Sequence, residues 1–197
     1  MTWMHDLRLE AVMAALRAAG AETIVDLGCG DGPLLVRLAH EQAIRRIVGV
    51  DVSAAALAAL RKRLVAAPDE VRSKVELRHA SMTEAGKLTG FDAAILVETI
   101  EHIAPDSLSQ VERAVFRDMR PAAVIITTPN SDFNALLGVP DNRMRHRDHR
   151  FEWGSARFRA WADGVAQRNG YEVTCENVAG GTQMAVFQSA LDAGRAA

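Results

Sequence analysis

The chain has 197 residues, of which 49% are hydrophobic and 24% charged, and its formal net charge is −2. These values predict one globular domain and exclude a disordered, collagen-like or coiled-coil chain. Without a global basic field, any contact with RNA or DNA has to be local. Two cysteines are too few for a disulfide framework, and neither a signal peptide nor a membrane-spanning run is recognisable, so we expect a cytoplasmic protein.

Helical periodicity and short apolar runs alternate along the chain. An amphipathic first helix is predicted from the apolar spacing between Leu9 and Leu16, ending near Gly20. Five short apolar runs that follow are typical of buried parallel strands: Thr23–Leu27, Ile47–Val50, Val75–Leu77, Ala93–Val97 and Val124–Thr128.

Three helices are predicted between and after these strands. Ser53, Asp106 and Ser155 are the expected N-caps of these helices, and Gly170 is expected to end the last one. Two final apolar runs, at 171–178 and 183–188, are joined by a glycine-containing turn with no helix between them, and therefore predict an antiparallel pair.

This pattern predicts an α/β fold in a single domain over residues 1–197, with 191–197 as a frayed tail. The sheet is expected to be mostly parallel, with an antiparallel C-terminal hairpin and right-handed crossovers. Such sheets bind ligands beyond the carboxyl ends of their strands, so residues that follow the first, second and fourth strands are the candidates for chemistry.

A glycine-rich loop follows the first strand in the order Asp26-Leu27-Gly28-Cys29-Gly30-Asp31-Gly32-Pro33. Glycines allow a sharp turn and a close approach of the backbone to a ligand. The nicotinamide fingerprint requires its third glycine at the position of Pro33, so dinucleotide binding is disfavoured. A strand-to-helix turn without a ligand is the structural alternative.

The loop resembles the first motif of class I S-adenosylmethionine-dependent methyltransferases, which have a Rossmann-like fold with a seven-stranded sheet. The resemblance implies S-adenosylmethionine as cofactor, with its ribose bound by the acid at the end of the second strand. The implied cofactor-binding residues are Asp26, Gly28, Gly30, Asp51, Ser81 and Met82.

Two acids and a histidine follow the fourth strand. If the segment turns helically, Glu98, Glu101 and His102 at i, i+3 and i+4 project to one side and suggest a divalent metal site. A fourth ligand is available in the histidine-rich stretch 143–150. Mixed oxygen and imidazole ligands suit Mn²⁺, Fe²⁺ or Co²⁺, with Mg²⁺ a weaker fit. A solvated helix start is the alternative.

Three blocks, 97–103, 127–130 and 145–153, resemble one specific family over residues 7–188: the HEN-type (Hua-enhancer) RNA 3′-terminal ribose 2′-O-methyltransferases, especially the bacterial members. The resemblance implies methyl transfer to the 2′-hydroxyl of the 3′-terminal nucleotide of RNA, in RNA repair or RNA-mediated silencing. The implied catalytic metal ligands are Glu98, Glu101, His102 and His149, with His146 as the rival of His149.

Four arginines lie between residues 143 and 150, where they either contact RNA phosphates or form a solvated basic loop. The predicted RNA-binding residues are Arg145, Arg147, Arg150 and Asn130. Bacterial members of the family usually carry a large N-terminal domain that this sequence lacks, which leaves an RNA-repair kinase or ligase partner without its docking domain.

Two other functions are compatible with the same residues. A metal-assisted O-methyltransferase for a small catechol-like diol makes similar demands on a metal, because two neighbouring oxygens bind one ion. A non-catalytic RNA-end-binding module is the other alternative, although such a module has no need of Glu98, Glu101 and His102.

Overall fold

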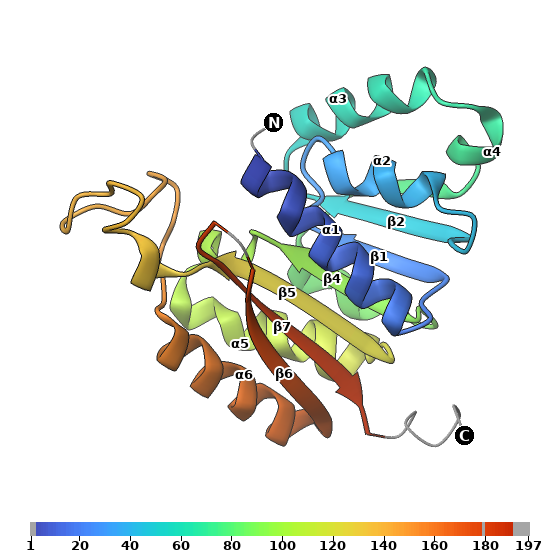
Figure 1. Cartoon of the computed structure of the whole chain (residues 1–197). Helices are drawn as coiled ribbons and strands as arrows, with labels where there is room; N and C mark the ends of the chain where they lie inside the picture. Colours follow the sequence, from blue (N-terminus) through green and yellow to red (C-terminus); the bar gives the residue numbers. More distant parts are fainter. Residues whose placement is uncertain (1–2, 179, 191–197) are drawn as a thin grey trace.

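A central seven-stranded sheet has the order β3-β2-β1-β4-β5-β7-β6 (Figure 1) in a computed structural model that describes residues 3–178 and 180–190. The first five strands run parallel, and β7 runs antiparallel to both β5 and β6. The predicted mostly parallel sheet with an antiparallel C-terminal pair is therefore confirmed. The predicted frayed tail at 191–197 lies outside the described residues.

The strands form where the apolar runs predict them, and each predicted boundary is within two residues of the observed one. They are β1 (Thr23–Leu27), β2 (Arg46–Asp51), β3 (Val75–His79), β4 (Ala93–Val97), β5 (Ala123–Pro129), β6 (Tyr171–Val178) and β7 (Thr182–Ser189). The α-helices are α1 (Trp3–Ala18), α2 (Pro33–His40), α3 (Ala54–Val65), α4 (Asp69–Arg72), α5 (Leu108–Glu112) and α6 (Ser155–Asn169). The 3₁₀ and π turns are η1 (Met82–Lys87), η2 (Ile100–His102), η3 (Pro105–Ser107), η4 (Arg113–Met119, π) and η5 (Ser131–Phe133).

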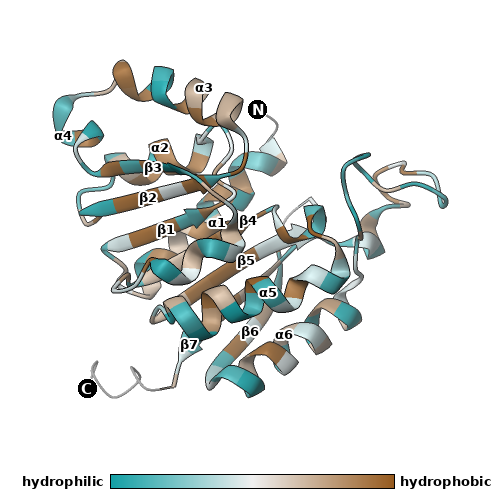
Figure 2. Ribbon diagram, turned by 180° about the vertical axis from the view of Figure 1, so that it is seen from behind, coloured by the Kyte–Doolittle hydropathy of each residue, from teal (hydrophilic) through white to brown (hydrophobic). Residues whose placement is uncertain are grey.

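Helices cover both faces of the sheet. On one face, α1, α2 and α3 pack against residues such as Ile24, and on the other face η1, α5, η4 and α6 pack against residues such as Val25 and Leu27. Both faces of the inner strands are thus buried, which explains why these strands are apolar throughout rather than alternating. Figure 2 shows this as mainly hydrophobic strands.

Two of the three predicted helix caps are wrong. Ser53 caps α3 as expected, since its side chain accepts a hydrogen bond from the backbone N–H of Ala56. Asp106 lies inside the 3₁₀ turn η3, because Pro105 starts that turn three residues before α5 begins. Ser155 is already helical, and its backbone N–H donates instead to the distant carboxylate of Asp132 at 2.9 Å.

The parallel strands end at one edge of the sheet, where the glycine loop, η2 and the segment after β5 come together. That segment, the arm (residues 134–150), projects from the body in orange in Figure 1 before the chain enters α6. Among the described helices, none combines the length and the apolar character required to cross a membrane.

Candidate active site

A cavity of about 610 Å³ opens at the carboxyl ends of β1, β2 and β4. This volume is in the range of small-molecule and cofactor sites. Its walls include most of the residues predicted to bind a cofactor together with two of the predicted metal ligands: Gly28, Asp51, Ser81, Met82, Glu98 and His102.

The glycine loop adopts a backbone that other residues rarely adopt. Gly28, Gly30 and Gly32 all have positive φ angles, of 80°, 56° and 78°. A Cβ atom at Gly28 would lie 2.5 Å from the Cγ2 atom of Thr99, so the loop packs directly against the segment that follows β4. The two predicted functional segments are therefore in contact.

Asp51 ties this loop to the end of β2. One oxygen of its carboxylate accepts a hydrogen bond from the N–H of Gly30 at 2.8 Å, and the other accepts one from the N–H of Ser53 at 2.7 Å. Both carboxylate oxygens are thereby held at the wall of the cavity.

Asp26 lies deeper, with 3% of its surface exposed. Burial, and then the charge of Asp51, raises the pKa of its carboxyl to about 7. It lines a second cavity of about 100 Å³ together with His5, Arg8 and Glu98. This cavity places α1 beside the glycine loop, a contribution of the first helix that the sequence pattern did not predict.

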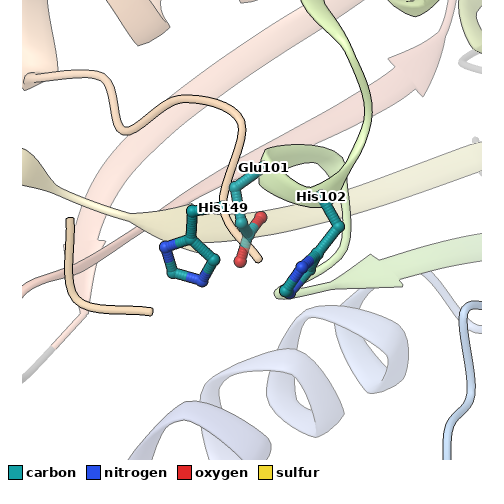
Figure 3. A group of neighbouring side chains, drawn as sticks. All are labelled: Glu101, His102 and His149. Carbon is teal, nitrogen blue, oxygen red and sulfur yellow. The ribbon is translucent and has the colours of Figure 1, made fainter. Parts of the chain in front are cut away.

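Glu101, His102 and His149 form a group whose candidate ligand atoms all lie within 4.8 Å of one another. Figure 3 shows the carboxylate of Glu101 between the two imidazole rings, with Glu101 and His102 on η2 and His149 on the arm. The backbone N–H of Arg150 donates to the carbonyl oxygen of Glu101 at 2.7 Å, which fastens the arm to η2.

Glu101 is incompletely satisfied by protein groups. It is fully buried, and one carboxylate oxygen accepts a hydrogen bond from the hydroxyl of Thr128 at 2.9 Å. The other oxygen, Oε1, is buried without a hydrogen-bond partner. Burial, and then the neighbouring Glu98, raises the pKa of this carboxyl well above its ordinary value. A buried acceptor of this kind, beside two imidazoles, fits a cation.

The two rival histidines differ in which ring nitrogen is available. His149 Nδ1 lies 2.5 Å from the carboxylate of Glu152, which only accepts, so Nδ1 carries the proton and a neutral ring has its lone pair on Nε2. Nδ1 of His146 instead accepts the backbone N–H of Asp148 at 3.2 Å, so the neutral ring is protonated on Nε2. The hydrogen bonds therefore favour His149 as a ligand.

Glu98 stands outside the group. Its φ angle is 51° and the helical turn begins only at Ile100, so the premise that residues 98–102 form one helical face is wrong. Its carboxylate forms an ion pair with Arg8 at 3.2 Å and accepts a hydrogen bond from the Thr127 hydroxyl at 3.1 Å. Burial raises the pKa of Glu98, against the opposing effect of Arg8.

Two of the predicted RNA-binding residues, Asn130 and Arg145, use their side chains for hydrogen bonds within the protein. Asn130 is fully buried and donates hydrogen bonds to Ser155 and Asn177. Arg145 points inward, where its guanidinium donates to Asn134 Oδ1 at 2.6 Å and to the carbonyl oxygens of Gly181 at 2.9 Å and Asn130 at 2.5 Å. Both residues hold the base of the arm.

Three other arginines of the arm are exposed: Arg143, Arg147 and Arg150. The side chain of Arg147 has 91% of its surface accessible and forms a 3.7 Å ion pair with the exposed Asp148, so a phosphate group can still reach it. RNA binding by the arm stays a prediction; Arg147 and Arg150 are the exposed residues among those predicted, whereas Arg145 is bonded within the protein.

Sequence reasoning missed Glu152. Its side chain is 3% exposed and contacts His149, one of the three residues of the candidate metal group. Burial opposes ionisation, but hydrogen bonds from Asn134, His149 and the Arg145 backbone outweigh it and lower the pKa of Glu152. The sequence did offer one indication of this role, because Glu152 lies only three residues after the candidate ligand His149.

Comparison with known proteins supplies a family for this geometry. A family model described as a methyltransferase domain matches residues 24–122. The methyltransferase domain of the bacterial protein CtHen1 is 33% identical, superposes with a TM-score of 0.84, and the match covers 94% of this chain and 99% of that domain. Magnesium protoporphyrin IX methyltransferase from Synechocystis, at 16% identity and a TM-score of 0.71, shares the fold.

Curated relatives carry the name small RNA 2′-O-methyltransferase. The mouse protein is 38% identical over 157 residues, and the Arabidopsis thaliana protein is 30% identical over 207 residues. These matches cover 76% and 92% of this chain but only 39% and 22% of the two relatives. The similarity is therefore to one part of a longer protein in each case.

Proposed function

The chain belongs to the Hen1-type family of methyltransferases, and on that premise we propose that it transfers a methyl group from S-adenosylmethionine to the 2′-hydroxyl of the 3′-terminal nucleotide of RNA. One observation carries the proposal. The group of Glu101, His102 and His149 adjoins the cavity that the glycine loop and Asp51 enclose, and His102 lines that cavity.

Asp51 and the glycine loop bind the cofactor in this proposal. The two oxygens of Asp51 accept hydrogen bonds from the ribose hydroxyls, and Ser81 and Met82 flank the adenine. Asp26 lies near the amino-acid end of the cofactor, in the smaller cavity beside α1. Gly28 leaves room for the backbone to approach the ligand.

Glu101, His102 and His149 hold a divalent cation, and the resemblance adds Glu98 as the fourth ligand. The unpartnered oxygen of Glu101 supports this assignment, since a cation would satisfy it. Mn²⁺ suits these ligands, and Co²⁺, Fe²⁺ and Mg²⁺ are the alternatives. When bound, such an ion supplies Lewis acidity toward a ribose hydroxyl and favours a pair of neighbouring oxygens, which only a 3′-terminal ribose offers.

Arg143, Arg147 and Arg150 supply the local positive charge that the chain as a whole lacks. They are exposed residues of the arm that also carries His149, and in this proposal they contact phosphates next to the terminal nucleotide. In this proposal two parts of the protein recognise the RNA: the metal group binds the terminal ribose, and the arm contacts the phosphate backbone of the RNA.

The test is transfer of a labelled methyl group from S-adenosylmethionine to a short RNA with free 2′ and 3′ hydroxyls. RNAs blocked at either hydroxyl, a DNA of the same sequence and a catechol are the controls. We expect labelling of the unblocked RNA alone, loss of labelling with a chelator and recovery with Mn²⁺. Labelling of the 3′-blocked RNA, or of catechol in preference to RNA, would overturn the proposal.

A further inference from the structure

The side chain of Glu152 takes part in three hydrogen bonds next to the candidate metal group. Its Oε1 atom lies 2.5 Å from Nδ1 of His149 and also accepts the backbone N–H of Arg145 at 2.7 Å. Its Oε2 atom accepts a hydrogen bond from Nδ2 of Asn134 at 2.7 Å. With 3% of the side chain exposed, water does not compete for these bonds.

The bond to His149 determines what the imidazole can do. A carboxylate only accepts, so it selects the tautomer with the proton on Nδ1 and leaves the lone pair on Nε2. It also fixes the rotation of the ring. A carboxylate that accepts a hydrogen bond from a ligand histidine in this way raises the basicity of the metal-binding nitrogen and restrains its direction.

The other two bonds of Glu152 reach the base of the arm. Asn134, where the arm begins, donates to Glu152 and accepts from the guanidinium of Arg145, whose backbone N–H returns to Glu152. These three residues form a closed ring of hydrogen bonds. His149 is attached to this ring through Glu152, so the position of the imidazole depends on the same carboxylate that closes the arm.

We propose that Glu152 is a positioning residue that directs Nε2 of His149 toward the metal ion and joins this ligand to the base of the RNA-binding arm. The inference rests on the proposed function for the metal group but assigns a separate role to a residue that is not itself a ligand. His146 differs from His149 in this respect. Its Nδ1 atom accepts a backbone N–H, so its neutral ring carries the proton on Nε2 and has no lone pair there for a metal.

Binding of Mn²⁺ to the RNA-free protein tests the proposal without a catalytic readout. Free Mn²⁺ gives an electron paramagnetic resonance signal that is lost on binding, so titration gives the affinity directly. We expect Glu152→Gln to weaken Mn²⁺ binding by about 10- to 100-fold, the usual effect of losing a partner that orients a ligand. Affinity for S-adenosylmethionine is expected to remain unchanged.

Glu112→Gln is the matched control. Glu112 is also a mostly buried carboxylate, and it is hydrogen-bonded by an arginine and an asparagine, Arg168 and Asn169, on the α5–α6 side of the fold. The same substitution there is expected to leave Mn²⁺ affinity unchanged. Asn134→Ala opens the ring of hydrogen bonds but keeps the bond between Glu152 and His149. We expect this variant to weaken Mn²⁺ binding less than about 3-fold, a small fraction of the effect of losing the orienting partner.

Nitrogen-15 NMR of the His149 ring in the metal-free wild-type protein provides a test that does not need a folded variant. The proposal requires a neutral ring protonated on Nδ1. A ring protonated on Nε2, or equal loss of Mn²⁺ affinity in Asn134→Ala and Glu152→Gln, would overturn the positioning role and leave the metal centre standing. A wild-type protein that binds no Mn²⁺ would overturn the metal centre and this role together.

Discussion

The two sides of the cleft differ in how their carboxylates are satisfied. On the cofactor side (residues 26–32, Asp51 and residues 81–82), each oxygen of Asp51 already accepts a backbone N–H. On the metal side (Glu98, Glu101, His102 and His149), Glu101 is fully buried and one of its oxygens has no partner. The Asp51 carboxylate is therefore satisfied by the protein itself, whereas the metal side keeps a buried acceptor that the proposed cation would satisfy.

The two sides also differ in how far apart their parts lie in the sequence. The cofactor side comes from consecutive strand ends between Asp26 and Met82. The metal side joins η2 to His149, nearly fifty residues later, through a backbone hydrogen bond from Arg150 to Glu101 and a ring contact between His102 and His149. Its geometry therefore depends on tertiary contacts more than on local turns, and substitutions there should separate catalysis from cofactor binding.

The largest expected effect is loss of catalysis from the metal side alone. We expect Glu101→Gln or His149→Ala to lower the rate of methyl transfer by about 1,000-fold or more, because several kcal/mol of transition-state stabilisation depend on a bound ion. Calorimetry with S-adenosylmethionine should give an affinity within about 3-fold of wild type, because neither Glu101 nor His149 lines the cavity proposed for the cofactor and sites that share no partner couple weakly.

His146→Ala is the control for this experiment, since the ring of His146 neighbours both His102 and His149 but offers no free nitrogen in its neutral form. It should retain most activity at saturating Mn²⁺. If His146→Ala loses activity as severely as His149→Ala, the division of roles between the two histidines is wrong. If cofactor affinity falls together with catalysis, the two sides are not independent.

The second effect concerns the buried acid of the cofactor side, Asp26. An unfolded chain releases this proton near a pKa of about 3.9, whereas burial raises the pKa in the folded chain to about 7. Between these values the folded state binds more protons, so stability falls as pH rises through this window and levels off above it.

For the cofactor-free protein, this difference corresponds to a loss of about 2 to 3 kcal/mol of unfolding free energy between pH 5 and pH 8 from Asp26 alone. Asp26→Asn cannot ionise and should lack this part of the pH dependence. Urea unfolding of both proteins at the two pH values measures the difference. Parallel pH dependence in wild type and variant would show that Asp26 is ionised throughout.

The cofactor side was the part that the sequence predicted well, for a physical reason. The strands and the glycine loop depend on local apolar runs and on residues that accept positive φ angles, and both are visible in short stretches of sequence. The position of Asp51 was predictable because it ends β2, and a parallel strand next to β1 has to end at the same edge of the sheet.

The metal side was predicted only in part, because its details are set by distant partners. Arg145 points inward since the carbonyl oxygens of Gly181 and Asn130, at the ends of β7 and β5, accept its guanidinium. Glu98 turns toward Arg8 on α1, which no local pattern indicates. The histidines in the stretch 143–150 indicated where a further metal ligand would come from. They did not indicate that the carboxylate of Glu152 would bond to His149 rather than to His146.

A third experiment tests the completeness of the cofactor side. We expect Asp51→Ala to weaken S-adenosylmethionine binding by about 1–3 kcal/mol, the usual cost of removing a charged hydrogen-bond acceptor. Since Asp51 also holds the N–H groups of Gly30 and Ser53, the loop should become more mobile, with faster amide exchange at Gly30. Unchanged cofactor affinity in a folded variant would exclude Asp51 from ribose binding.

The smallest expected effect distinguishes the two kinds of arginine on the arm. Arg147 is exposed, whereas Arg145 is bonded to the protein through all of its guanidinium nitrogens. Arg147→Ala should raise the RNA concentration needed for half-maximal activity a few-fold and reduce the slope of log affinity against log salt by about 0.7, the value for one phosphate contact on a single strand.

Arg145→Ala should leave that slope unchanged and instead lower the melting temperature by about 3 to 6 °C, because internal hydrogen bonds are lost. Arg45, paired with Glu22 just before β2 and thus at the opposite edge of the sheet from the cleft, provides the control for a lost surface charge. Filter binding of RNA at several salt concentrations measures all three variants. Equal salt slopes for Arg147→Ala and Arg45→Ala would mean that the arm does not contact phosphate, and the metal side would then select the RNA end through its terminal ribose alone.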